Sequence, residues 1–285
     1  MQYCGRPFTA SDIELIRTLI GASPPLTRAA LSREVCERLG WRGAAGRLKD
    51  MSCRVALLRM QAHGLITLPP PRNARPVIYR AHPEIERAVL EPPIVPAVDL
   101  AELTVDLVGT KRDSLLWNAY IQRHHYLGHQ LMPGAQLRYF VRAAGQIIAL
   151  LSFGASAWKT KPRDQFIGWA HNERPRNLHL IVNNARFLIL PWIKCRNLAS
   201  RSLALISRRL AQDWHTRYAY RPVLLETFVE KPRFAGTCYK AANWQYLGDT
   251  QGRGKLDRLH RNAEPVKSVW VYPLVSDFRR HLCNG

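Results

Sequence analysis

A proline-rich segment, EPPIVPAVDL at residues 91–100, divides this sequence into two parts. Proline fixes the backbone φ and lacks an amide N–H, so three prolines within ten residues disfavour both a regular helix and an inner strand. The segment is typical of a semi-rigid linker. We therefore expect one domain over residues 1–90, a linker over residues 91–104 and a second domain over residues 105–285.

The first domain shows the pattern of a winged helix-turn-helix. The apolar periodicity predicts three helices followed by two short strands, at residues 11–20, 27–39, 51–63, 65–68 and 77–79. In such a domain the third helix enters the DNA major groove, so Arg54 and Arg59 are expected to contact DNA. Arg72 and Arg75, in the loop between the two strands, are expected to reach phosphates or the minor groove. A dimerisation module with solvated arginines is the alternative.

The second domain mixes strands with helices. The expected elements are strands at residues 137–141, 146–153, 179–183, 186–190, 222–229, 245–247 and 269–272, and helices at 114–124, 200–214 and 236–244. Asn197 or Ser200 is expected to cap the long helix that ends near Trp214. The order predicts an α+β fold, in which helices cover a mixed α/β sheet.

The charge of the chain indicates an anionic partner. Its formal net charge is +21, and its isoelectric point is about 10.4. Residues 1–100 carry 14 Lys and Arg against 9 Asp and Glu, and residues 101–285 carry 28 against 12. So large an excess favours binding to nucleic acid, single- or double-stranded DNA, over a merely basic surface.

Several protein classes are not expected. The sequence has no stretch of about 18 apolar residues and no apolar segment typical of a signal peptide near residue 1, which predicts a cytoplasmic protein without a membrane partner. The six cysteines form no C-x-x-C pair, which argues against a cysteine zinc site. The nucleotide-binding Walker A motif, G-x-G-x-x-G, H-E-x-x-H and G-x-S-x-G are all missing.

The densest group of candidate site residues lies between Leu224 and Arg258. Glu226 ends an apolar strand, where a carboxylate can act as a general base or, with Asp164, bind the Mg²⁺ or Mn²⁺ of a nuclease. An ion pair with an arginine is the alternative. Tyr239 could serve as a general acid, and Trp244 could stack on a base or belong to the core.

Two other groups could contact nucleic acid. Arg253, Lys255 and Arg258 lie in a glycine-rich loop, which predicts phosphate binding because glycines free the backbone and cations neutralise phosphates. His125 precedes Tyr126, a pattern that suggests a histidine-assisted tyrosine nucleophile. Packing by the tyrosine and hydrogen bonding by His125 are the structural alternative.

Long motifs resemble the family named for DruA of the bacterial Druantia anti-phage system, whose domain also occurs beside transposase-like sequences. The motifs are HHYLGHQLMPGAQLRYFV, RDQFIGW, RFLILPWIKCRNLASRSLALISRRLAQDW, LLETFV, GTCYKAANW and LGDTQGRGK. The segments LSREVCERLGW and LKDMSCRVALLRMQAHGLITLP nearer the start resemble it too. The resemblance implies a role in antiviral defence or in a mobile element, with other defence subunits such as a helicase as partners.

The order of strands and helices in the second domain also resembles the acetyltransferase fold. That fold cradles the pyrophosphate of CoA on a glycine-rich turn at the start of a helix. The corresponding turn here, Arg196–Arg201, contains no glycine, so CoA binding is not expected.

Three functions remain open at this point. The chain could be a nucleic-acid-binding protein that also cleaves DNA with a metal ion. It could be an acyl-CoA-dependent N-acyltransferase. It could also be a non-catalytic DNA-recognition subunit that recruits a helicase.

Overall fold

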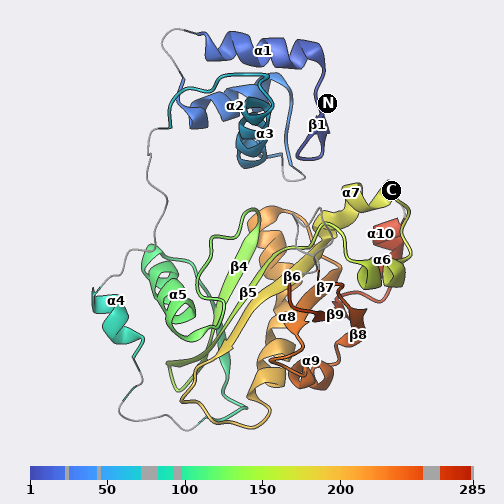
Figure 1. Ribbon diagram of the computed structural model, residues 1–285. Helices are drawn as coiled ribbons and strands as arrows, with labels where there is room; N and C mark the ends of the chain where they lie inside the picture. The colour runs from blue at the N-terminus through green and yellow to red at the C-terminus, as the bar shows by residue number, and fades with distance from the viewer. Residues whose placement is uncertain are drawn as a thin grey trace. The chain divides into compact units, whose positions relative to one another are not determined.

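The chain forms two compact units, residues 1–80 and 81–285 (Figure 1). The computed structural model describes residues 1–22, 26–43, 46–71, 83–90, 92, 98–252 and 264–283. The division falls ten residues before the predicted one. The reason is that Val89 is buried, and that Ala88 and Val89 accept hydrogen bonds from Tyr120 and His124 of the second unit.

The N-terminal unit contains three helices packed around one apolar core. Its elements are β1 (Gln2–Tyr3), β2 (Arg6–Pro7), α1 (Ala10–Ile20), α2 (Arg28–Arg38) and α3 (Asp50–Ala62). Thr9 caps α1 in a reciprocal capping box with Asp12, and Thr27 caps α2, so both helices begin where their hydroxyl caps predict. Ile16, Leu31 and Met60 are completely buried in the core.

The strand predicted at residues 65–68 is wrong. This segment forms no strand; Ile66 and Leu68 are buried against the helices, and the Leu68 N–H donates to the side chain of Gln61 at 2.9 Å. The segment at residues 65–68 therefore forms a hydrogen bond with α3 and not with a neighbouring strand. The second strand of the expected wing, residues 77–79, lies outside the described residues. The three helices are present, and the winged-helix assignment is not confirmed.

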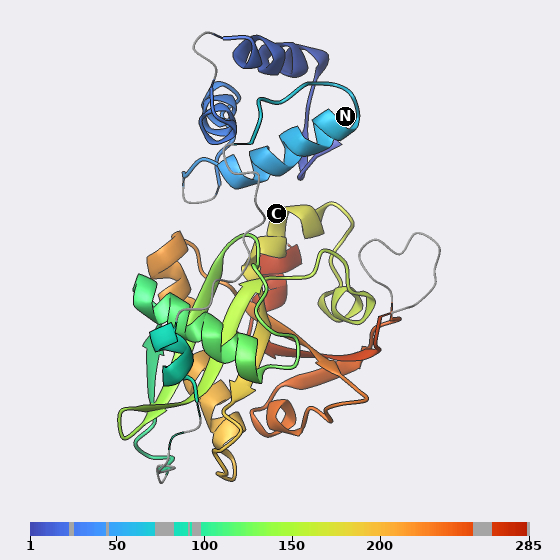
Figure 2. The ribbon, with the colours of Figure 1, turned by 60° about the vertical axis from the view of Figure 1, so that its left-hand side comes forward.

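The C-terminal unit is a mixed seven-stranded sheet with helices on both faces (Figures 1 and 2). In chain order its elements are α4 (Pro83–Ala88), β3 (Thr104–Leu107), α5 (Lys111–His124), β4 (Gln136–Ala143), β5 (Gln146–Ala155), α6 (Lys161–Ile167), α7 (Glu173–Asn177), the 3₁₀ turn η1 (Leu178–Leu180), β6 (Ile181–Ile189), α8 (Leu198–Tyr218), β7 (Leu224–Glu230), α9 (Thr237–Ala241), β8 (Gln245–Asp249), β9 (Lys267–Pro273) and α10 (Phe278–Cys283).

The strands lie side by side in the order β3-β4-β5-β6-β7-β9-β8. Among the described residues, the central pair β6 and β7 is parallel and the other pairs are antiparallel. The helix α8 connects these two parallel strands, as a crossover must. The predicted mixed sheet of an α+β fold is thus confirmed.

The two faces of the sheet are covered by different helices. On β4, Arg138 donates to Ser114 and Asn118 of α5, whereas the adjacent Tyr139 donates to Asp213 of α8. Since successive strand residues point to opposite faces, α5 and α8 lie on opposite sides of the sheet (Figure 2). The helices α6 and α10 pack beside Leu224 of β7.

The strands predicted at residues 179–183 and 186–190 are one strand. β6 runs from Ile181 to Ile189 without interruption, but its register against β5 shifts where Ser152 pairs with Arg186 and Phe153 pairs with Asn184. The extra residue, Ala185, is a β-bulge. The polar residues that suggested a break in the sequence therefore lie at a bulge inside a continuous strand.

Candidate functional site

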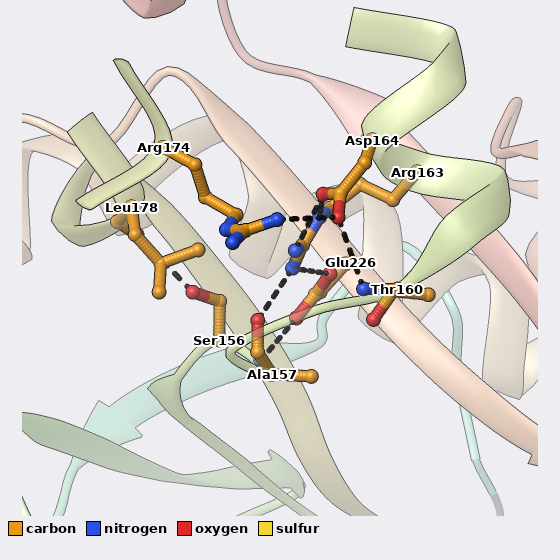
Figure 3. A network of polar contacts seen from close by, with 8 residues as sticks. All are labelled: Ser156, Ala157, Thr160, Arg163, Asp164, Arg174, Leu178 and Glu226. Atoms are coloured by element: carbon orange, nitrogen blue, oxygen red, sulfur yellow. Dashed lines mark hydrogen bonds and ion pairs between the residues drawn. The ribbon is translucent and has the colours of Figure 1, made fainter. Parts of the chain in front are cut away.

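Glu226 lies at the centre of a buried network of charged groups (Figure 3). Its side chain is completely buried, and one carboxylate oxygen lies 2.8 Å from an Nη of Arg163, which is also completely buried. The other oxygen accepts the N–H of Ala157 at 2.7 Å, while Arg163 donates to the Ala157 carbonyl at 2.8 Å. The structure therefore shows the ion-pair alternative for Glu226.

Asp164 joins this network from α6. It accepts two hydrogen bonds from Arg163, at 2.7 and 3.0 Å, and the N–H of Thr160 at 3.2 Å. An Nη of Arg174 lies 3.6 Å from its second oxygen (Figure 3). The pair that was predicted to bind a metal, Glu226 and Asp164, is thus held together by an arginine between them.

Burial governs the electrostatics of the network. Complete burial raises the pKa of the Glu226 carboxyl, and the Arg163 guanidinium opposes this shift. Two arginines and two carboxylates balance in charge, as buried ions require. The network forms hydrogen bonds with both backbone groups of Ala157 and with the N–H of Thr160. It therefore fixes the loop between β5 and α6.

Strand alternation separates Glu226 from Tyr239, the candidate general acid. The next residue on β7, Thr227, faces the other side, where its hydroxyl lies 3.5 Å from the Tyr239 hydroxyl. Tyr239 donates to the Asn184 side chain at 2.7 Å, and burial raises the pKa of its phenol. Glu226 and Tyr239 therefore do not form one site.

Trp244 is a core residue instead of a base-stacking platform. It is only 3% exposed, and its ring lies 5.1 Å from that of Tyr239 and 5.9 Å from that of Tyr272. A base could reach this ring only if the unit opened.

A large cleft adjoins the buried network. Its volume is about 1300 Å³, and it lies between the β5–α6 loop, α6, Arg174 and the ends of β8 and β9. Its lining contains the cations Lys159, Lys161, Arg174 and Lys267. Of the lining carboxylates, Asp164 and Asp249 have cationic partners, and the exposed Glu264 is a third.

An exposed tryptophan lies in the loop that the network fixes. Trp158 is 56% exposed, between Ala157 and Lys159, and the Arg174 guanidinium lies 5.4 Å from its ring centroid. Among the described residues, neither Lys159 nor Lys161 forms an ion pair. This feature was not predicted from the sequence, although the alternation of Trp, Lys and Arg in WKTKPR is the pattern of a nucleic-acid contact.

His125 and Tyr126 lie at the end of α5. Their rings stack at 4.8 Å, and Arg233 covers the Tyr126 ring at 4.6 Å. Burial, with a smaller contribution from Arg186, lowers the pKa of His125 to about 4. Burial raises the pKa of Tyr126, which disfavours its phenolate as a nucleophile.

The predicted DNA contacts of the N-terminal unit are only partly described. Arg54 pairs with Asp50 at 2.9 Å and donates to Ser32, while Arg59 is exposed on α3. Arg72 and Arg75, the other predicted contacts of this unit, lie outside the described residues, as do Arg253, Lys255 and Arg258 of the C-terminal unit.

The turn before α8 carries a side chain at a position whose backbone conformation favours glycine. Asn197 adopts φ +63°, the left-handed conformation that glycine favours, and thus places a side chain where glycine would leave the backbone open.

No group of three or more His, Cys, Asp and Glu residues that could hold a metal ion occurs in the part of the chain that the structure describes. None of the described helices has the length and apolar character needed to cross a bilayer.

The fold defines a class of mixed-sheet proteins in which a crossover helix joins two central parallel strands. Residues 82–263 match the family described as Druantia protein DruA. The match spans more than half of the sequence, so this chain belongs to the DruA family. No curated protein gave a match.

Solved structures that resemble the chain include N-acetyltransferases. The ribosomal-protein-S18-alanine N-acetyltransferase from Escherichia coli shares 12% identity, with a TM-score of 0.37 over 60% of this chain and 94% of that chain. An N-acetyltransferase from Staphylococcus aureus Mu50 shares 11%, with a TM-score of 0.37 over 60% and 97%. The aminoglycoside acetyltransferase AAC(6')-Ib shares 13%, with a TM-score of 0.39 over 60% and 95%. Likenesses of this strength do not carry an activity to this chain.

Proposed function

We propose that this protein binds single-stranded nucleic acid as one component of a bacterial anti-phage defence system. Membership of the DruA family supports the defence role, because Druantia is an anti-phage system. Since that system has several components, this chain would be one of them. The net charge of +21 supports an anionic ligand. The observation that carries the proposal is Trp158, an exposed indole whose ring lies 5.4 Å from the Arg174 guanidinium and whose chain neighbours Ala157 and Lys159 line a large cleft.

A single strand fits this arrangement better than a duplex. Unpaired bases can stack on an aromatic side chain, whereas bases in a duplex already stack on one another. Arg174 covers one side of the Trp158 ring, and the ring remains more than half exposed for a base. Lys159 and Lys161, on either side of Thr160, would neutralise the phosphates that follow the stacked base.

Recognition without cleavage is the form of this function that we propose. Arg163 occupies the position between Glu226 and Asp164 that a bound metal ion would need. Cleavage during defence would then fall to another subunit of the system.

The stacking role can be tested at Trp158. Its replacement by alanine should weaken binding of a single-stranded oligonucleotide by about 1–3 kcal/mol, roughly 5- to 150-fold, because a base loses its stacking partner. Fluorescence anisotropy with a labelled oligothymidine would measure this loss. Trp158→Phe keeps an aromatic face and should recover most of the affinity. Equal affinities of all three proteins would remove Trp158 from the binding surface.

The electrostatic role can be tested at the two lysines. For the double variant Lys159→Ala/Lys161→Ala, the slope of log affinity against log salt should be shallower by about 1.4, since each phosphate contact on a single strand contributes about 0.7. Arg201 and Arg208, exposed on α8 at the opposite face of the sheet, provide the matched control. An unchanged slope in the lysine variant, or an equal change in the arginine variant, would place the strand elsewhere.

A further inference from the structure

A second, smaller cavity lies on the α5 side of the sheet. Its volume is about 130 Å³, which is room for roughly four water molecules. Its walls come from α5, from the loop after it and from strands β4 and β6. The polar side chains that line it include Ser114, Asn118, His129, Gln136, Arg138 and Arg186.

Two arginines share this cavity without a carboxylate. Arg138 donates to the neutral oxygens of Asn118 and Ser114, each at 2.8 Å, and Arg186 donates to the Ala185 carbonyl at 2.8 Å. Among the described residues, neither guanidinium forms an ion pair. The contrast with Arg163, which contacts two carboxylates, is marked.

The surroundings make two unpaired cations costly. Burial lowers the pKa of both Arg138 and Arg186. The pKa of His129, which lines the same cavity, is also lowered. Burial is the largest cause, and the charges of these two arginines lower it further. Both arginines are only partly exposed, and a partly desolvated charge without a counter-charge is unfavourable, so the site gains when an anion enters it.

Trp117 supplies an independent indication of a ligand. Its side chain lines the cavity and is only 2% exposed, yet its buried indole Nε1 has no hydrogen-bond partner among the residues that the structure describes. Buried donors are nearly always paired, and an orphan donor at the wall of a cavity indicates a missing acceptor.

The β-bulge in β6 brings the two arginines together. In the register, Ser152 of β5 pairs with Arg138 on one side and with Arg186 on the other, so the two Cα atoms lie roughly 10 Å apart across three strands. Asn184 faces the opposite side, toward Tyr239. Strict alternation would put Arg186 on that side too, and the extra residue at the bulge turns it toward α5.

We propose that the cavity between Arg138 and Arg186 binds a phosphate group. Guanidinium forks match phosphate oxygens in geometry and charge. The small volume suits the terminal phosphate of a monoester. Free phosphate and the phosphorylated end of a nucleic acid share this chemistry; only the second source rests on the function proposed above.

Inorganic phosphate tests the site itself. The full-length protein should melt at a higher temperature in phosphate than in chloride of equal ionic strength, because the anion binds the folded state. Arg186→Met should melt at a similar or higher temperature without phosphate and should lose the phosphate-dependent increase. Arg142→Met provides the control. Arg142 lies on β4, the strand of Arg138, but pairs with Asp106 outside the cavity. It should keep the response.

Calorimetric titration covers the case in which Arg186→Met does not fold. Arg186→Lys retains the charge but not the fork, and it should bind inorganic phosphate about tenfold or more weakly than the wild type. A phosphate response that is missing from the wild type, or equally large in the Arg186 variants, would overturn the proposal. The Lys159→Ala/Lys161→Ala protein should still bind phosphate, so failure of the cleft and failure of this site are separate results.

Oligonucleotides then identify the source of the phosphate. Tighter binding of a 5′-phosphorylated strand than of the same strand with a 5′-hydroxyl, with the difference lost in Arg186→Lys, would assign the site to nucleic-acid ends. Equal binding of the two strands, together with a response to inorganic phosphate, would assign it to a free or small-molecule phosphate.

Discussion

Replacement of Glu226 by glutamine is expected to lower the free energy of unfolding by about 3–5 kcal/mol. The amide keeps the shape of the carboxyl group but removes the charge that balances the completely buried Arg163. One oxygen would also be replaced by an N–H₂ group that cannot accept a hydrogen bond from Arg163 or Ala157. Urea denaturation followed by circular dichroism would measure the change.

The neighbouring Glu230→Gln provides the control for this experiment. Glu230 lies on the same strand, but its partner Arg233 is 3.7 Å away and half exposed, so the expected loss is below about 1 kcal/mol. The double variant Glu226→Leu/Arg163→Met should recover much of the stability, because it removes both buried charges. A stable Glu226→Gln protein that no longer binds nucleic acid would contradict the structural role and restore Glu226 to the functional site.

The ion pair at Glu226 shows how far the sequence could lead. A carboxylate in an otherwise apolar strand marks a buried charge, and an arginine partner was one of two expected outcomes. The identity of that partner could not be predicted, because the chain contains 42 Lys and Arg residues and Arg163 lies 63 positions away. Only the packing of α6 against the sheet selects it.

The fold was predictable wherever local chemistry determines it. Thr27 begins α2 because its hydroxyl accepts an N–H of the first helical turn, and the apolar runs of β4 and β5 on either side of Ala144 and Gly145 identify a hairpin. The bulge at Ala185 was not predictable, since a polar interruption of a strand has the same pattern as a break between two strands. The Arg138–Arg186 cavity depends on that bulge and was missed with it.

Replacement of Gly236 by alanine should cost about 2–4 kcal/mol. Gly236 precedes α9 with φ +72°, a conformation that costs a residue with a Cβ roughly 1–2 kcal/mol. The new Cβ would also lie 2.9 Å from three atoms of the Trp270 ring, and such overpacking typically costs about 1–3 kcal/mol. The segment carrying Tyr239 would then have to move away from β9.

Gly168→Ala separates these two contributions. Gly168 ends α6 with a similar φ of +80°, but a Cβ there would meet nothing within 4 Å. Its substitution should therefore cost only the conformational part, roughly 1–2 kcal/mol. The difference between the two variants in thermal and urea unfolding measures the contact with Trp270. If both variants lose the same stability, the ring moves aside without cost, and close packing of Gly236 on Trp270 does not hold α9 in place.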